Sequence, residues 1–230
     1  MRVIEAIVFD KDGTLFDFHA TWSAWAQGLI GHLSEGDATR EDALARAMHF
    51  DLRAGRFRPT SPIVAGTNRE AAECVTEGLG GGDVAAMEAL LMTSVADAPL
   101  APAVPLADYL DALKARGLRL GVMTNDTEAG ARAHLTRSGV EDRFDFIAGF
   151  DSGHGAKPDP DPLLAFAQAV GIAPARALMV GDSLHDLVAG RAAGMRTAGV
   201  LTGTATRADL DPHADVVLPD IGHIPAWLDG

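Results

Sequence analysis

The chain opens with a short apolar run that ends in a cluster of acids. Residues 3–9 read Val-Ile-Glu-Ala-Ile-Val-Phe, and Asp10 and Asp12 follow directly. A short run rich in Val, Ile and Phe that stops at polar residues is typical of a strand buried in a parallel sheet. We therefore predict a buried strand over residues 3–9.

Helical spacing replaces this pattern from Phe18 to about Ala98, and no strand pattern interrupts it. Apolar residues recur there at the spacing of one helix face, which favours helices over strands. The expected helices lie near residues 20–33 and 41–53, from 67 onward, and from 84 to about 95. Thr67–Glu70 fits a capping box, and Asp83 is placed to cap the last helix.

Beyond Ala98 the pattern becomes an alternation of strands and helices. A proline-rich segment, residues 98–105, comes first and is a plausible domain boundary. The expected strands are 118–123, 144–148, 177–180, 197–201 and 216–218, with helices near 105–116, 127–138, 160–170 and 184–193. Such alternation predicts a parallel sheet covered on both faces. The predicted fold is α/β, with a Rossmann-like parallel-sheet core from residues 1–16 and 99–230 and an all-helical insertion at 17–98.

Composition narrows the classes of function. With 47% apolar residues the chain can bury a core, and its net charge of −13 disfavours binding to nucleic acid or anionic lipid. The single cysteine, Cys74, permits no internal disulfide, and Glu5 and Asp10 come too early for a signal peptide. The longest stretch without formal charge, Phe18–Ser34, has the spacing of an amphipathic helix rather than a membrane span. We expect a soluble, cytoplasmic protein that binds neither nucleic acid nor membrane.

Candidate chemistry begins at Asp10-Lys11-Asp12-Gly13-Thr14, directly after the first predicted strand. Two carboxylates two residues apart would lie near the carboxyl edge of the sheet, where open α/β folds bind ligands. Gly13 would allow the sharp turn that leaves the strand. An acidic turn that merely ends the strand is the plainer alternative.

Three more polar strings follow predicted strands or lie in loops between strands and helices. Thr124 and Asn125 could donate to phosphoryl oxygens, or simply cap the next helix. Lys157 is one of only three lysines and could be a positioned charge or a solvated loop residue. Asp182 and Asp186 are four residues apart, so both can face the same side as a helix begins, although such turns are common.

The two acidic strings together suggest a metal site. Asp10 and Asp182 would meet at one sheet edge and form an oxygen-rich site for a hard, octahedral cation. Magnesium fits that description better than zinc. The scattered histidines of the helical insertion lack the spacing of zinc ligands.

These four strings, in this order and at these places, resemble those of the haloacid dehalogenase superfamily, and most closely its phosphoglycolate phosphatase-like branch with a helical cap. The resemblance covers nearly the whole chain and is strongest for the first and last strings. It implies a magnesium-dependent phosphatase acting on a small phosphorylated metabolite, phosphoglycolate-like or a sugar phosphate.

The resemblance also implies a role for each residue. Asp10 would attack phosphorus and form an aspartyl-phosphate, while Asp12 would serve as general acid and then general base. Thr124, Asn125 and Lys157 would hold the phosphoryl oxygens. The magnesium ligands would be the Asp10 carboxylate, the Asp12 backbone carbonyl and Asp182, with Asp186 nearby or outside the inner ligands.

Other activities remain to be weighed. Dehalogenase-type relatives lack the second carboxylate, so Asp12 argues for phosphate chemistry. Phosphonoacetaldehyde hydrolase-like relatives use a cap lysine, and the insertion here contains none. A phosphomutase of the β-phosphoglucomutase type is the main alternative, and a non-catalytic interaction module is a distant one. Four arginines of the insertion could contact a second phosphate or form a solvated face: Arg53, Arg56, Arg58 and Arg69.

Overall fold

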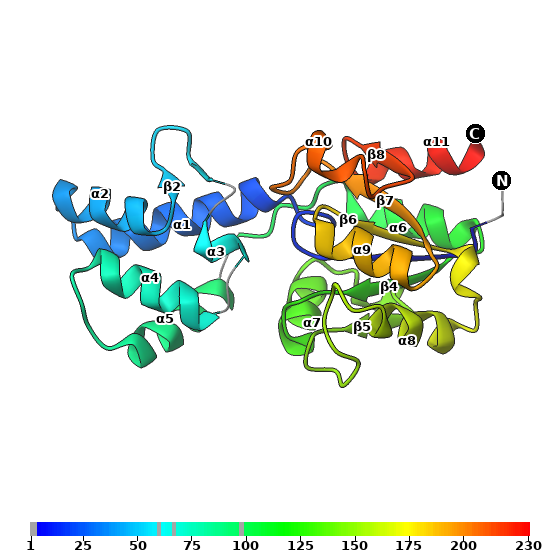
Figure 1. Cartoon of the computed structure of the whole chain (residues 1–230), viewed down its shortest axis with the longest axis horizontal. Helices are drawn as coiled ribbons and strands as arrows, with labels where there is room; N and C mark the ends of the chain where they lie inside the picture. Colours follow the sequence, from blue (N-terminus) through cyan, green and yellow to red (C-terminus); the bar gives the residue numbers. More distant parts are fainter. Residues whose placement is uncertain (1–3, 59–60, 66–67, 97–98) are drawn as a thin grey trace. The chain divides into compact units, whose positions relative to one another are not determined.

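The computed structural model describes residues 4–58, 61–65, 68–96 and 99–230. The chain forms two compact units (Figure 1). We call Met1–Phe18 together with Leu100–Gly230 the sheet unit, and His19–Pro99 the helical unit. In the described part of the chain, no helix has the length and apolar character needed to cross a membrane.

The sheet unit is built on a six-stranded sheet in the order β5-β4-β1-β6-β7-β8. Its strands are β1 (Ala6–Phe9), β4 (Arg119–Met123), β5 (Phe146–Ala148), β6 (Ala177–Gly181), β7 (Arg196–Val200) and β8 (Val216–Leu218). Every neighbouring pair is parallel. The predicted α/β class with a parallel sheet is therefore confirmed.

Helices cover both faces of this sheet because its central strand is apolar on both faces. In β1, Ile7 and Phe9 belong to one buried cluster with residues of α6 (Leu106–Ala115) and α7 (Glu128–Arg137). Ala6 and Val8 belong to another cluster, with residues of α8 (Asp161–Val170) and α9 (Leu184–Ala192). This alternation is the two-residue period of a strand. The helices of the sheet unit are α6 (Leu106–Ala115), α7 (Glu128–Arg137), α8 (Asp161–Val170), α9 (Leu184–Ala192), α10 (Arg207–Leu210) and α11 (Ile224–Asp229).

Two of these helices, α10 and α11, were not predicted. They contain four and six residues. A helix that short makes hardly more than one turn, so no repeat of apolar positions can reveal it. The longer helices of the unit lie close to their predicted ranges.

The helical unit contains α1 (Phe18–Ser34), α2 (Ala38–Ala47), α3 (Pro62–Ala65), α4 (Asn68–Gly78) and α5 (Val84–Ala96). The cap of α5 is as predicted, because the Asp83 side chain accepts bonds from the backbone N–H groups of Ala85 and Ala86. The predicted capping box at 67–70 includes Thr67, which lies outside the described residues.

The expectation of a helix near 41–53 without any strand is wrong. The second helix ends at Ala47, and a short antiparallel hairpin follows, with strands β2 (Phe50–Asp51) and β3 (Arg56–Phe57). The Asp51 side chain accepts bonds from two turn N–H groups, and the rings of Phe50 and Phe57 meet edge to face at 5.0 Å. Strands of two residues are too short to show alternation in the sequence.

Candidate active site

Three of the four predicted strings follow strands that are neighbours in the sheet. Asp10 follows β1, Thr124 follows β4 and Asp182 follows β6. Because β1 pairs in parallel with both β4 and β6, the ends of the three strands lie side by side. The sheet topology therefore brings these side chains to one edge, as open α/β folds do for ligand sites.

A buried cluster of carboxylates lies at this edge. Asp10, Asp182 and Asp186 each offer an oxygen, and these oxygens lie within 4.8 Å of one another. All three side chains are buried. Carboxylates so close together, and out of water, repel one another unless a cation lies among them.

Glycines leave the space that this cluster occupies. A Cβ atom added to Gly13 would lie 2.5 Å from Cγ of Asp182, and one added to Gly203 would overlap the same carboxylate. A Cβ on Gly181 would overlap the Asp186 side chain. From the sequence, Gly13 was expected only to form a turn. The steric role of Gly203 was not predicted, because this glycine lies in a loop far along the chain.

Lys157 supplies one cation to the cluster. Its Nζ lies 2.6 Å from Oδ1 of Asp10, 2.6 Å from Oδ1 of Asp186 and 2.8 Å from the carbonyl oxygen of Met123. Burial opposes the charge of this lysine, but the two carboxylates outweigh burial and raise its pKa above the usual range. Lys157 is thus a buried, fully hydrogen-bonded ammonium rather than a solvated loop residue.

One ammonium does not balance three acids. Burial raises the pKa of Asp10 to about 7; Lys157 opposes this shift and Asp186 adds to it. Burial also raises the pKa of Asp182, as do the charges of Asp10 and Asp186. The cluster therefore favours a further positive charge, and a donor set of carboxylate oxygens suits magnesium.

Asp186 has two functions in this cluster. Its Oδ2 accepts bonds from the backbone N–H of Ser183 at 3.0 Å and from the Ser183 hydroxyl at 2.7 Å, which caps the start of α9. Its Oδ1 is left to pair with Lys157. The helix cap thus fixes the orientation of the carboxylate that faces the lysine.

Asn125 holds the loop that carries Lys157. Its Nδ2 donates to the Lys157 carbonyl oxygen at 2.8 Å, and its Oδ1 accepts from the Lys157 backbone N–H at 3.0 Å. The contact of Asn125 with phosphoryl oxygens remains a prediction. The second hydrogen on Nδ2 would have to make that contact. The neighbouring Thr124 is buried, and its Oγ1 accepts the backbone N–H of Asp126 at 3.1 Å.

A second buried lysine lies beside Asp12. The Nζ atom of Lys11 lies 2.5 Å from Oδ2 of Asp12, 3.3 Å from Oδ2 of Asp126 and 3.0 Å from Nδ1 of His134. The Lys11 side chain is fully buried. Lys11 was not among the site residues predicted from the sequence, although it is as rare a lysine as Lys157.

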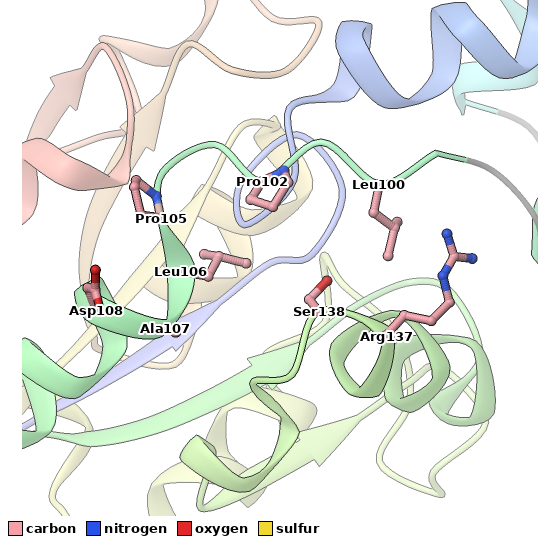
Figure 2. Close-up of a pocket in the computed structure, with 8 residues that line it drawn as sticks. All are labelled: Leu100, Pro102, Pro105, Leu106, Ala107, Asp108, Arg137 and Ser138. Atoms are coloured by element: carbon pink, nitrogen blue, oxygen red, sulfur yellow. The ribbon is translucent and has the colours of Figure 1, made fainter.

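A separate groove of about 440 Å³ lies elsewhere on the sheet unit (Figure 2). Residues of the segment before α6, of α6 itself and of the end of α7 line it: Leu100, Pro102, Pro105, Leu106, Ala107, Asp108, Arg137 and Ser138. None of the predicted site residues is among them. The chemistry predicted from the sequence therefore does not belong to this groove.

In the helical unit, one of the four candidate arginines has partners of its own. Arg69 forms ion pairs with Glu73 and Glu88 on the unit's surface. These pairs favour the interpretation of Arg69 as part of a solvated face.

Comparisons with known proteins agree with this geometry. A family model described as haloacid dehalogenase-like hydrolase matches residues 4–194. The chain is 31% identical to phosphoglycolate phosphatase of Rhodospirillum rubrum over 229 residues, covering 97% of this chain and 90% of that protein. It is 28% identical to pyrophosphatase PpaX of Bacillus velezensis over 212 residues, covering 91% and 90%. The fold is similar to that of a HAD family hydrolase from Deinococcus radiodurans solved with phosphate and sodium, with a TM-score of 0.74, 21% identity and coverage of 99% and 96%.

Proposed function

This chain belongs to the haloacid dehalogenase-like hydrolase family, and from that premise we propose that it is a magnesium-dependent phosphatase acting on a small phosphorylated metabolite. The family match confirms the resemblance drawn from the four strings. One observation carries the proposal: Asp10, at the end of the central strand, touches Lys157 and lies within 4.8 Å of Asp182 and Asp186. A carboxylate nucleophile, a fixed ammonium and a cation site thus meet at one point.

The proposed reaction has two displacements. In the first, an oxygen of Asp10 attacks phosphorus, the ester P–O bond breaks, and Asp12 gives its proton to the departing oxygen. In the second, Asp12 takes a proton from a water molecule whose oxygen attacks phosphorus, which releases phosphate and restores Asp10. Dividing the reaction in this way makes each step easier than a direct displacement.

Charge stabilisation is the main task of the remaining residues, because phosphoryl transfer depends on positioning and electrostatics. Lys157 would offset the charge of the phosphoryl oxygens, while Asn125 fixes the loop from which that lysine projects. The Thr124 hydroxyl would donate to one of those oxygens.

The magnesium ligands would be the carboxylates of Asp10 and Asp182 and the backbone carbonyl of Asp12. Asp186 would act from outside these ligands, because its oxygens already accept bonds from Lys157 and Ser183. When bound, magnesium would supply positive charge against the phosphoryl oxygens and the nucleophile. The raised pKa values of Asp10 and Asp182 support this assignment, since burial, together with the neighbouring carboxylates, makes their negative charges costly without a further cation.

The relatives narrow the substrates worth testing. One is named for phosphoglycolate and another for pyrophosphate, so both compounds belong in a panel with sugar phosphates. A phosphomutase would pass its phosphoryl group to a sugar phosphate rather than to water. Sustained hydrolysis without a sugar acceptor therefore distinguishes the phosphatase from the mutase.

The test measures phosphate released from this panel and from p-nitrophenyl phosphate, with magnesium or with EDTA. We expect turnover with magnesium, none with EDTA, and none from Asp10→Asn. The matched control is Asp211→Asn, an exposed aspartate of the sheet unit, which should retain full activity. Activity that survives Asp10→Asn, or that is indifferent to EDTA, would overturn the proposal.

A further inference from the structure

Lys11 is a buried cation that the proposed reaction does not yet use. It lies between the two acids of the first string, and its side chain has no exposed surface. An ammonium has three N–H donors, and three acceptors surround this one: Oδ2 of Asp12, Oδ2 of Asp126 and Nδ1 of His134. Each donor thus has one acceptor, which fixes the ammonium in place.

His134 completes this arrangement as a neutral group. Burial and the nearby charge of Lys11 lower the pKa of His134 to about 4. Because an ammonium can only donate, Nδ1 of His134 must accept, and its ring proton lies on Nε2. The ring is also held by packing edge to face against Phe16, with centroids 6.3 Å apart. His134 is therefore a rigid anchor on α7 for the Lys11 side chain.

The two oxygens of Asp12 have different surroundings. Oδ2 is 2.5 Å from the ammonium of Lys11, whereas Oδ1 is buried without a hydrogen-bond partner among the described residues. A hydrogen bond from an ammonium to a carboxylate oxygen is stronger than one between neutral groups, so Oδ2 is the oxygen that Lys11 fixes. The geometry thus distinguishes the oxygen that Lys11 holds from the oxygen that has no partner among the described residues.

We propose that Lys11 is a positioning residue for the general acid: through its contact with Oδ2 it holds the Asp12 carboxyl group in the orientation from which it exchanges a proton with the leaving oxygen. The inference rests on the proposed phosphatase function. Lys11 touches neither the phosphoryl group nor the leaving group in this scheme and acts only through Asp12. Its effect should therefore depend on how much the leaving group needs a proton.

The test compares two phosphate esters that differ in this need. p-Nitrophenolate leaves readily without protonation, whereas the alkoxide from ethyl phosphate does not. We use kcat/KM because it includes ester cleavage and excludes later hydrolysis of the intermediate. Lys11→Met should lower kcat/KM for ethyl phosphate by about 10²-fold, because general acid catalysis contributes a factor of that size. It should lower kcat/KM for p-nitrophenyl phosphate by less than about 5-fold.

A double-mutant cycle tests whether Lys11 acts through Asp12. In an Asp12→Asn background the acid is already lost, so adding Lys11→Met should change kcat/KM for ethyl phosphate by less than about 2-fold. The matched control is Lys114→Met, the same substitution at an exposed lysine of α6, which should affect neither ester. Equal losses on both esters, or full losses in the Asp12→Asn background, would refute the positioning role.

If Lys11→Met does not fold, a less disruptive substitution tests the positioning role of Lys11. Asp126→Asn removes one charged acceptor of Lys11 at a side chain that is 37% exposed. It should lower kcat/KM for ethyl phosphate by about 3-fold more than for p-nitrophenyl phosphate. A uniform loss refutes the inference. Absence of phosphatase activity in the unmodified protein would instead refute the proposed function, so the two failures are distinguishable.

Discussion

Removing the charge of Lys157 tests whether the carboxylate cluster depends on the ammonium of this side chain. Its Nζ lies 2.6 Å from both Asp10 and Asp186, and all three side chains are buried. Loss of one partner from a buried ion pair costs about 3–5 kcal/mol. For a chain of this size each 1 kcal/mol moves the melting temperature by about 2–4 °C, so Lys157→Met should lower it by about 6–20 °C near pH 8 without metal.

The cost should depend on pH with a definite sign. Burial raises the pKa of Asp10 to about 7 even with Lys157 present, and loss of the ammonium raises that pKa further. Near pH 5.5 the carboxyl is then protonated in the folded variant and needs no counter-charge. Near pH 8 the folded variant must either ionise this carboxyl without a counter-charge or keep on it a proton that the unfolded chain has lost, and both cost stability. The difference in melting temperature between the unmodified protein and Lys157→Met should therefore shrink as pH falls.

Thermal melts in EDTA at about pH 5.5 and about pH 8 measure this dependence. Lys114→Met is again the matched control and should have no effect at either pH, because that lysine is exposed. A melting temperature that Lys157→Met leaves unchanged, or lowers equally at both pH values, would refute the view that the ammonium is the counter-charge of the buried acids.

Two further predictions concern the cation site. Since the pKa values of Asp10 and Asp182 are raised, binding of magnesium must displace protons from these carboxyls. The affinity for magnesium, measured by titration calorimetry, should therefore increase from about pH 6 to about pH 8. An affinity that does not change with pH would contradict the assignment of these ligands. Gly203→Ala should weaken magnesium binding and activity by more than about 10-fold, because the new Cβ would overlap the Asp182 carboxylate. Gly28→Ala is its control, since a Cβ at that helical position meets nothing within 4 Å and should leave activity unchanged.

Much of the fold could be predicted because its main elements are long and strongly patterned. The strand at Ala6–Phe9 and its acidic end were evident from a run of apolar residues beside two aspartates. The hairpin at residues 50–57 and the helix at Arg207–Leu210 were not, because each strand or helix contains too few residues to repeat a pattern. Local sequence patterns therefore identified the long elements better than the short ones.

The candidate site was predictable where a residue directly follows a strand, and not where a partner comes from a distant segment of the chain. Asp10 and Asp182 fall into the first class. Gly203 and His134 fall into the second, because only the folded chain brings them to Asp182 and to Lys11. Lys11 itself showed no sign of burial, since lysine is usually exposed.

In the proposed reaction, Asp10 receives the phosphoryl group beside this cation site. The most direct measurement is rapid acid quenching during turnover with magnesium, followed by borohydride reduction and mass spectrometry of the peptide that contains residue 10. An acyl phosphate on Asp10 would appear as homoserine at that position, and the account predicts this product in the unmodified protein and its absence in Asp10→Asn. Turnover with unmodified Asp10 throughout, or with the reduced residue elsewhere, would contradict the account.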